Sequence, residues 1–127
     1  MSNADLRERV KEPPSALLVE SYYRPAVARA QAQVFDHEMW AHLAHGLMLD
    51  RQGIVAREAL AACLRCVLDL AAQGPDAVPV DHRAEDLYSY VERRIIAELG
   101  PDTGGRLHTG QGSGFGAVIA WLRRRRA

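Results

Sequence analysis

The sequence predicts an all-α protein, a single small helical domain. Apolar residues recur three or four positions apart in three long stretches, about residues 21–51, 56–73 and 81–99, which is the spacing of one face of a helix. No stretch shows the strict alternation of a convincing strand. The 127 residues, 48% hydrophobic and 25% charged, suit one domain with a buried core. The short connections between the stretches favour antiparallel neighbouring helices.

Composition excludes several classes of function. The formal net charge is zero, so nothing draws the whole chain towards nucleic acid or a membrane surface. No apolar run approaches the roughly 20 residues of a membrane span. The N-terminal sequence has no apolar core of a secretory signal, and the two cysteines do not make a disulfide framework. We therefore expect a cytoplasmic protein that binds neither nucleic acid nor membrane.

The first long helix is expected to start near Ser21, a possible N-cap, and Pro25 is tolerated in a first turn. It should run to about Arg51 and end at Gly53. Its expected apolar stripe, with Trp40 and Leu47 at the flanks, is Val27, Ala30, Val34, Ala41, Ala44 and Met48.

The second helix is expected over about residues 56–73, because Gly74 and Pro75 follow it and cannot continue it. The inward-facing residues predicted from its periodicity are Leu60, Leu64, Val67, Leu68 and Ala71.

The third helix has Asp81 as a candidate N-cap, with Glu85 and Asp86 in a first turn that favours carboxylates. Gly100 is expected just past its end, and Pro101 is expected to stop the chain from continuing as a helix. Its apolar stripe is Ala84, Leu87, Tyr88, Val91, Ile95, Ile96 and Leu99.

After this helix the sequence TGGRLHTG, residues 103–110, is expected to be a loop whose paired glycines permit tight turns. A short helix at residues 4–11 and another at residues 115–126 complete the expected elements. The second of these ends in four arginines, Arg123 to Arg126, which we interpret as a solvated helix end rather than a phosphate-contacting tail.

Several motifs together resemble one family. Residues 84–92, with Ala84-Glu85-Asp86 opening a helix and Glu92 following, lead to Gly100, Gly105 and the LHTG segment, Leu107-His108-Thr109-Gly110. Upstream, AHGLML at 44–49 is followed by QGI at 52–54. This pattern resembles the argininosuccinate lyase family of the fumarase/aspartase superfamily. The resemblance covers about residues 15–110 and only the first of the family's three domains.

The resemblance implies that His108, Thr109 and Gly110 belong to a segment that grips the substrate's carboxylates, for which hydroxyl, amide and guanidinium donors are suited. The implied reaction is carbon–nitrogen lysis of argininosuccinate to arginine and fumarate, in arginine biosynthesis. In that reaction a base removes a carbon-bound proton, and placed donors stabilise an aci-carboxylate.

The chain departs from the family after Gly110. The family continues Arg-Ser-Arg-Asn-Asp, whereas this sequence reads QGSGF at 111–115, and Tyr88 stands where the family has a histidine. The T-H-x-Q segment and the catalytic-serine segment G-S-S-x-M-P do not occur in these 127 residues. We therefore expect a lyase-like region at 1–110 and a glycine-rich connector with a basic helix at 111–127.

From these departures we assign no catalytic residue and expect a truncated or incomplete lyase chain, inactive alone. The alternative is a non-catalytic helical interaction module derived from the lyase domain. The expected partners are further copies of this chain or the missing lyase domains, and a small dicarboxylate-type substrate only in a complete assembly. Association would use apolar side chains such as Trp40 and Leu47, because a domain this small can bury only part of its apolar faces.

Two cofactor patterns are weaker than their alternatives. GSGFGA at 112–117 matches a relaxed dinucleotide pattern, but no strand precedes it, so a flexible connector is favoured. His42 and His45 could meet Cys63 and Cys66 at equal height on antiparallel helices, as in a zinc site. Buried cysteines that pack as small apolar residues are favoured instead. No cofactor and no metal are therefore expected.

Overall fold

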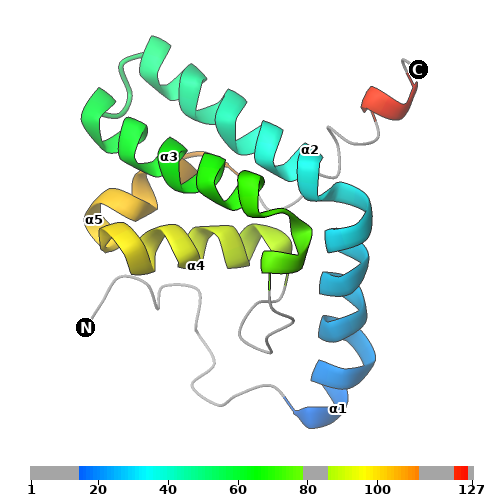
Figure 1. Cartoon of the computed structure of the whole chain (residues 1–127). Coiled ribbons are helices and arrows are strands. Elements are labelled where there is room, and N and C mark those ends of the chain that lie inside the picture. The colour runs from blue at the N-terminus through cyan, green and yellow to red at the C-terminus, as the bar shows by residue number, and fades with distance from the viewer. Residues whose placement is uncertain (1–14, 79–85, 112–121, 126–127) are drawn as a thin grey trace.

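The computed structural model describes residues 15–78, 86–111 and 122–125, and this part of the chain is predominantly helical (Figure 1). No strand occurs among these residues, so the predicted all-α class is confirmed. Figure 1 shows α2 and α3 side by side in opposite directions, with α4 packed below α3. The elements in order are α1 (Ala16–Leu18), the π-helix η2 (Val19–Tyr23), α2 (Arg24–Arg51), α3 (Arg57–Gln73), the 3-10 helix η3 (Pro75–Ala77), α4 (Leu87–Leu99), α5 (Pro101–Gly104) and the 3-10 helix η4 (Gly105–His108).

The first long helix begins earlier than predicted. Ser15, not Ser21, is the N-cap, and its side chain accepts a hydrogen bond from the Leu18 N–H at 3.3 Å. The chain then stays helical through η2 into α2. Pro25 has no N–H and crowds the carbonyl four residues before it. The wider π turn, in which the Arg24 N–H donates to the Val19 carbonyl, lies next to this proline and accommodates it.

The buried face of α2 differs from the predicted stripe. Val27 and Ala41 are buried as expected, but Ala44 and Met48 are exposed, so that part of the prediction is wrong. The other buried positions of the helix are Phe35, Glu38, Met39, His42, His45, Gly46 and Leu49. Three of these are polar or charged. A search for apolar periodicity therefore finds a stripe that is rotated away from the true buried face.

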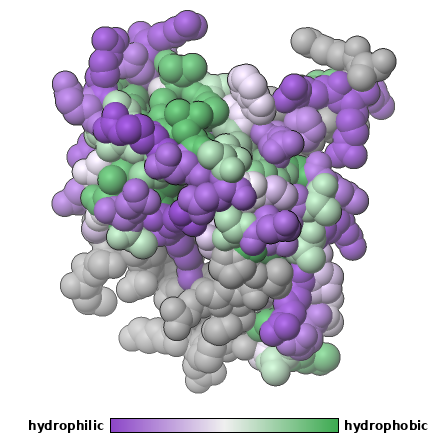
Figure 2. All heavy atoms as spheres, in the orientation of Figure 1, coloured by the Kyte–Doolittle hydropathy of each residue, from purple (hydrophilic) through white to green (hydrophobic). Residues whose placement is uncertain are grey.

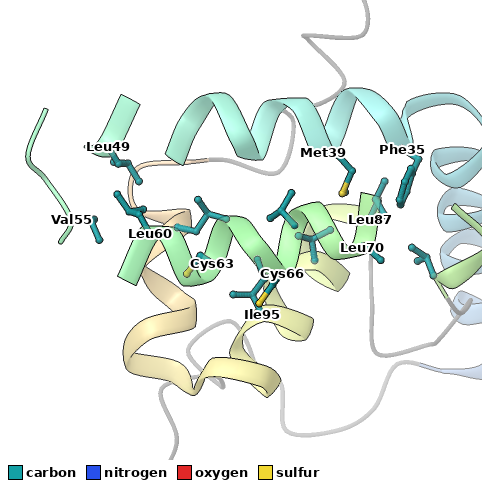
Figure 3. Packing of buried hydrophobic residues seen from close by; sticks show 14 of the residues in the cluster. Phe35, Met39, Leu49, Val55, Leu60, Cys63, Cys66, Leu70, Leu87 and Ile95 are labelled. Atoms are coloured by element: carbon teal, nitrogen blue, oxygen red, sulfur yellow. The ribbon is translucent and has the colours of Figure 1, made fainter. Parts of the chain in front are cut away.

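Helix α3 ends where it was predicted to end. Gly74 follows it at a φ of 83°, a conformation that glycine adopts without strain. Leu60 and Val67 are buried as expected, but Leu68 is 51% exposed, which corrects the prediction. The buried face is completed by Cys63, Cys66 and Leu70, which Figure 3 shows in the packed interior between the helices.

A bidentate ion pair closes the turn between α2 and α3. The Arg57 guanidinium donates to both carboxylate oxygens of Asp50, at 2.9 and 3.1 Å. The hydrogen bond from Arg57 holds the pKa of Asp50 below its usual value. Gly53 supplies the positive φ, 63°, that the turn needs.

Helix α4 begins at Leu87, with Asp86 as its N-cap accepting from the Ser89 N–H at 2.7 Å. The expectation that Asp86 lies within the first turn, with Asp81 as the cap, is therefore wrong. Asp81, Ala84 and Glu85 lie outside the described residues. Leu87, Tyr88, Val91 and Ile95 are buried, as their spacing predicted.

The prediction that Pro101 stops the chain from continuing as a helix is wrong. Gly100, at a φ of 82°, ends α4, and Pro101 starts α5. Residues 103–108 of the segment expected to be a loop are helical, because η4 follows α5 directly, while Thr109 and Gly110 form a turn. The paired glycines are not turn residues, since Gly104 and Gly105 both have negative φ. Gly104 is needed for another reason: a Cβ there would lie 2.7 Å from the Ile96 Cα.

One apolar cluster joins α2, α3, α4 and η4 (Figure 3). Leu107 of η4 has no exposed surface, so this short element is packed into the core rather than laid over it. Of the expected terminal helices, the one at 4–11 lies outside the described residues, and residues 122–125 of the other are helical. No helix in the described part of the chain is long and apolar enough to cross a membrane.

Candidate functional site

The candidate site is built where α2, α4 and η4 meet, around three aromatic rings. The His42 ring stacks on Tyr88 with centroids 5.8 Å apart. The His108 ring packs edge-on against both, at 5.2 Å from His42 and 4.9 Å from Tyr88. Each of the three side chains is buried. The cluster brings together residues from three separate parts of the sequence.

Carboxylates approach two of these rings. Glu38 lies one turn before His42 on α2, and its Oε1 is 3.3 Å from the His42 Nε2, with both side chains buried. Glu92 of α4 places its Oε1 3.9 Å from the His108 Nδ1. Each of the two histidines therefore has one carboxylate beside its ring.

The backbone after η4 is held by side chains distant in sequence. The His45 Nε2–H donates to the Thr109 carbonyl oxygen at 2.9 Å. The Tyr88 hydroxyl donates to the Gln111 carbonyl oxygen at 3.1 Å. These bonds lie on either side of Gly110, which has a φ of 71°. The turn at Gly110 is thus fixed from α2 and from α4.

The predicted substrate-binding residues occupy two environments. His108 is only 8% exposed and points into the ring cluster, so it does not lie on the surface. Thr109 and Gly110 are exposed. The Thr109 hydroxyl donates to the Arg106 carbonyl at 2.8 Å, which leaves its oxygen lone pairs available to a ligand. Thr109 and Gly110 are therefore the members of the LHTG segment that a substrate can reach.

Sequence reasoning missed the role of Glu38 and did not place His42 beside Tyr88. The signal in the sequence was the i,i+4 spacing of Glu38 and His42 on one helix face. That spacing predicts a contact between the two side chains but not its burial. The sequence marked Tyr88 only as a departure from the resembled family, which has a histidine at that position.

The candidate zinc residues do not converge. The Cys63 thiol donates to the Thr103 carbonyl at 3.3 Å, towards α5. His42 faces Tyr88 and His108, and His45 faces Thr109. In the residues that the structure describes, no group of three or more His, Cys, Asp or Glu side chains could hold a metal ion.

Burial raises the pKa of both thiols. The pKa of Cys66 rises to about 11, because the thiol is desolvated and because Glu98 lies close to it. The pKa of Cys63 is raised for the first of these reasons. A thiol is nucleophilic as the thiolate, so these cysteines are poor nucleophiles at neutral pH.

The remaining sequence candidates lie at the C-terminal end. The dinucleotide-like run at 112–117 and Arg126 are outside the described residues. Arg123 is exposed in a helical segment, as expected for a solvated helix end, and its guanidinium lies 5.9 Å from the centre of the Trp40 ring and 3.5 Å from the His37 Nδ1. Arg124 and Arg125 are exposed.

Comparison with known proteins supports the resemblance seen in the motifs. Argininosuccinate lyase 1 of Shouchella clausii is 30% identical over 103 residues, which are 81% of this chain and 21% of that protein. Argininosuccinate lyase of Methanosphaerula palustris is 37% identical over 78 residues, and that of Rhodococcoides fascians is 35% identical over 83 residues. No protein-family profile and no solved structure matches the chain.

The helical fold, the LHTG segment and these relatives together define a lyase-like chain. More particularly, the chain is similar to argininosuccinate lyases, as the motifs indicated. The chain spans between a sixth and about a fifth of the length of the curated relatives it matches.

Proposed function

We propose that this chain supplies the first helical domain of an argininosuccinate lyase active site and that it is inactive by itself. The observation that carries the proposal is the fixed turn of the LHTG segment. His45 and Tyr88 hold the backbone on both sides of Gly110, while Thr109 and Gly110 stay exposed. A binding segment needs this combination of a rigid backbone and accessible polar groups.

The proposed role of the segment is to bind a carboxylate of argininosuccinate. The Thr109 hydroxyl and the backbone at Gly110 would meet the carboxylate oxygens, and His108 would support them from below through its contacts with His42, Tyr88 and Glu92. No catalytic residue is assigned to this chain. The base and the serine of the implied elimination would come from another polypeptide segment, and the products would be arginine and fumarate.

Activity measurements test the first part of the proposal. The purified chain should release no fumarate from argininosuccinate, followed by fumarate absorbance against a buffer control. Mixing it with a separately expressed lyase relative that lacks the matching region should give fumarate. Fumarate release by the chain alone, or an inert mixture of two well-folded proteins, would contradict the proposal.

Ligand titration tests the residues. In two-dimensional NMR spectra, argininosuccinate or succinate should shift the amide signals of Thr109, Gly110 and Gln111. Thr109→Val keeps the side-chain shape and removes the hydroxyl. It should therefore lower the affinity for the ligand that is measured from these amide shifts. Thr103→Val, at a half-buried position on α5, is the matched control and should leave it unchanged. If the parent and both variants bound the ligand with equal affinity, the Thr109 hydroxyl would not be part of the binding site.

A second candidate function is a non-catalytic helical interaction module that acts in the cytoplasm. It is favoured by the outward face of α2, where Trp40 is 60% and Leu47 53% exposed. Large apolar side chains gathered on one face often mark an interaction site. A neighbouring reading frame that carries T-H-x-Q and G-S-S-x-M-P would favour the lyase, whereas association without complementation would favour the module.

A further inference from the structure

The outward face of α2 carries a line of five exposed residues, here called the α2 strip: Asp36, Trp40, Ala44, Leu47 and Arg51. They follow one another at intervals of four, four, three and four residues. That spacing keeps side chains on one face of a helix and is the seam spacing of paired helices. The strip runs about 22 Å along the helix axis, from a rise of about 1.5 Å per residue.

The surface over α2 and α3 is partly apolar. Figure 2 shows apolar side chains gathered over the paired helices α2 and α3, bordered by hydrophilic ones. Beside Trp40 the surface is hollowed, and this hollow of about 290 Å³ is lined by Trp40, Ala41, Ala44 and Arg123. A dry cavity of about 150 Å³ can admit benzene. The hollow beside Trp40 is larger than that and open, so it can admit an aliphatic side chain.

The strip is complementary to itself when it is reversed. Asp36 precedes Trp40 by four residues, and Arg51 follows Leu47 by four residues. A twofold axis beside Ala44 therefore brings Asp36 opposite Arg51 of a second copy and Trp40 opposite Leu47 of that copy. Ala44 lies at the crossing, where a small side chain lets two helices approach closely.

We propose that the α2 strip is a dimer interface in which a second copy of this chain packs antiparallel along α2. Leu47 of each copy enters the hollow beside Trp40 of the other. Two Asp36–Arg51 ion pairs, one at each end of the strip, set the direction and register. Such an interface is isologous and closed, so it produces dimers rather than chains of molecules.

Charge selects a second copy as the occupant. Within the described part of the chain, neither Asp36 nor Arg51 forms an ion pair, so both are available to a partner. An unrelated apolar helix could pack against Trp40 and Leu47. It would not, however, generally carry a basic and an acidic side chain at the separation of Asp36 and Arg51, whereas a second copy of this chain does. This interface is independent of the proposed lyase function, because the LHTG segment lies in the second half of η4 and directly after it and takes no part in the α2 strip.

Sedimentation equilibrium with charge reversal tests the register. The parent should show a monomer–dimer equilibrium in the micromolar range. Asp36→Arg and Arg51→Asp should each raise the dissociation constant of the dimer roughly tenfold. Each change replaces two attractions by two repulsions in the symmetric dimer. The double variant, Asp36→Arg with Arg51→Asp, should restore it. A monomeric parent, or no restoration, would overturn the proposal.

Cross-linking tests the position of the axis. Ala44→Cys should form a disulfide-linked dimer under mild oxidation, because the two copies of this residue lie near the twofold axis. Ala32→Cys, also exposed on α2 but far from the axis, is the matched control and should not. Equal cross-linking of both variants would show unspecific association.

A third variant separates the interface from folding. Trp40→Ser with Leu47→Ser should abolish the dimer while helical circular dichroism is kept, since both side chains are exposed. Leu68→Ser, an equally exposed leucine on α3, should leave the equilibrium unchanged. A dimer that survives the Trp40 and Leu47 changes would place the interface elsewhere.

Discussion

The His45 Nε2 atom lies 2.9 Å from the carbonyl oxygen of Thr109, a residue 64 positions later in the chain. His45 belongs to the AHGLML motif and Thr109 to the LHTG segment, so one hydrogen bond joins the two stretches that carry the family resemblance. It also ties the exposed turn at Gly110 to a buried position of α2. The stability of that turn should therefore depend on α2.

Replacing His45 tests this dependence. His45→Ala should lower the free energy of unfolding by about 1 kcal/mol, the usual value of one hydrogen bond in a partly buried site. The backbone amides of Gly110 and Gln111 should then exchange hydrogen faster, as seen by NMR. His37→Ala, the same change on the same helix but away from the LHTG segment, should leave their exchange rates unaltered. Unchanged exchange in His45→Ala would mean that the turn is held by other contacts.

The Tyr88 hydroxyl should contribute to the same turn. Tyr88→Phe removes the 3.1 Å bond to the Gln111 carbonyl and leaves a partly buried acceptor without its donor, at a cost of about 1–2 kcal/mol. Tyr90→Phe is the control, because its hydroxyl makes two long contacts, donating to the Ala77 carbonyl at 3.4 Å and accepting from the Arg94 Nη1 at 3.4 Å, and it should cost less than about 0.5 kcal/mol. Urea unfolding of both variants measures the difference, and equal losses would be evidence against the assigned bond.

Replacing two adjacent glycines by alanine should have different effects on the free energy of unfolding. At Gly104 a Cβ would lie 2.7 Å from the Ile96 Cα and 2.8 Å from the Ile95 carbonyl oxygen, so α5 would have to move away from α4. We expect Gly104→Ala to cost about 2–3 kcal/mol. At Gly105 nothing lies within 4 Å and φ is −73°, so Gly105→Ala should be neutral or stabilising by up to about 1 kcal/mol.

Thermal or urea unfolding of the two glycine variants gives the comparison directly. Both substitutions add the same methyl group, so propensity and solubility effects are matched. If Gly104→Ala were as stable as the parent, the close packing of α5 on α4 would be wrong.

The raised thiol pKa of Cys66 should make stability fall in alkaline solution. The folded protein holds this proton up to a pKa of about 11, against an ordinary value of 9.0. The folded state is therefore favoured below pH 9, and the advantage is lost as pH rises from about 9 to 11. The size of the loss is on the order of 2 kcal/mol. Cys66→Ala should show a shallower decline over the same range, which separates Cys66 from other groups that titrate there.

Thiol reactivity supplies a second measurement for the same environment. Both cysteines are free and buried, so an aromatic disulfide reagent at pH 8 should react slowly with the native protein and rapidly in urea. Fast reaction of the native protein would contradict both the burial and the raised pKa.

The positions of the three long helices could be read from the sequence because their ends are locally encoded. Gly74 and Gly100 adopt the positive φ that glycine tolerates, and each terminates a helix at its predicted end. The starts were less predictable. Ser15 and Ser21 are both competent caps, as are Asp81 and Asp86, and the choice between them depends on how far the helix continues to find packing partners.

The candidate site was only partly accessible to sequence reasoning. The motif pointed to His108, Thr109 and Gly110, but nothing local indicates that His108 turns inward while its two neighbours face solvent. That difference arises because η4 is packed into the core through Leu107, which fixes the direction of the next side chain. Burial of His42 likewise depends on the rings of Tyr88 and His108, which α4 and η4 bring to α2, whereas Glu38 contacts His42 within α2 itself.

The sequence by itself determined the all-α class, the C-terminal ends of the long helices and the relation to argininosuccinate lyases, because periodicity, breakers and motifs are properties of neighbouring residues. The tertiary structure alone decided which side of α2 is buried, that a polar ring cluster lies beneath the LHTG segment, and that Trp40 and Leu47 remain exposed. The physical reason is that burial is a relation between elements. A helix face that is apolar in sequence is exposed when no other element covers it, and a polar face is buried when another element supplies its hydrogen-bond and ring contacts.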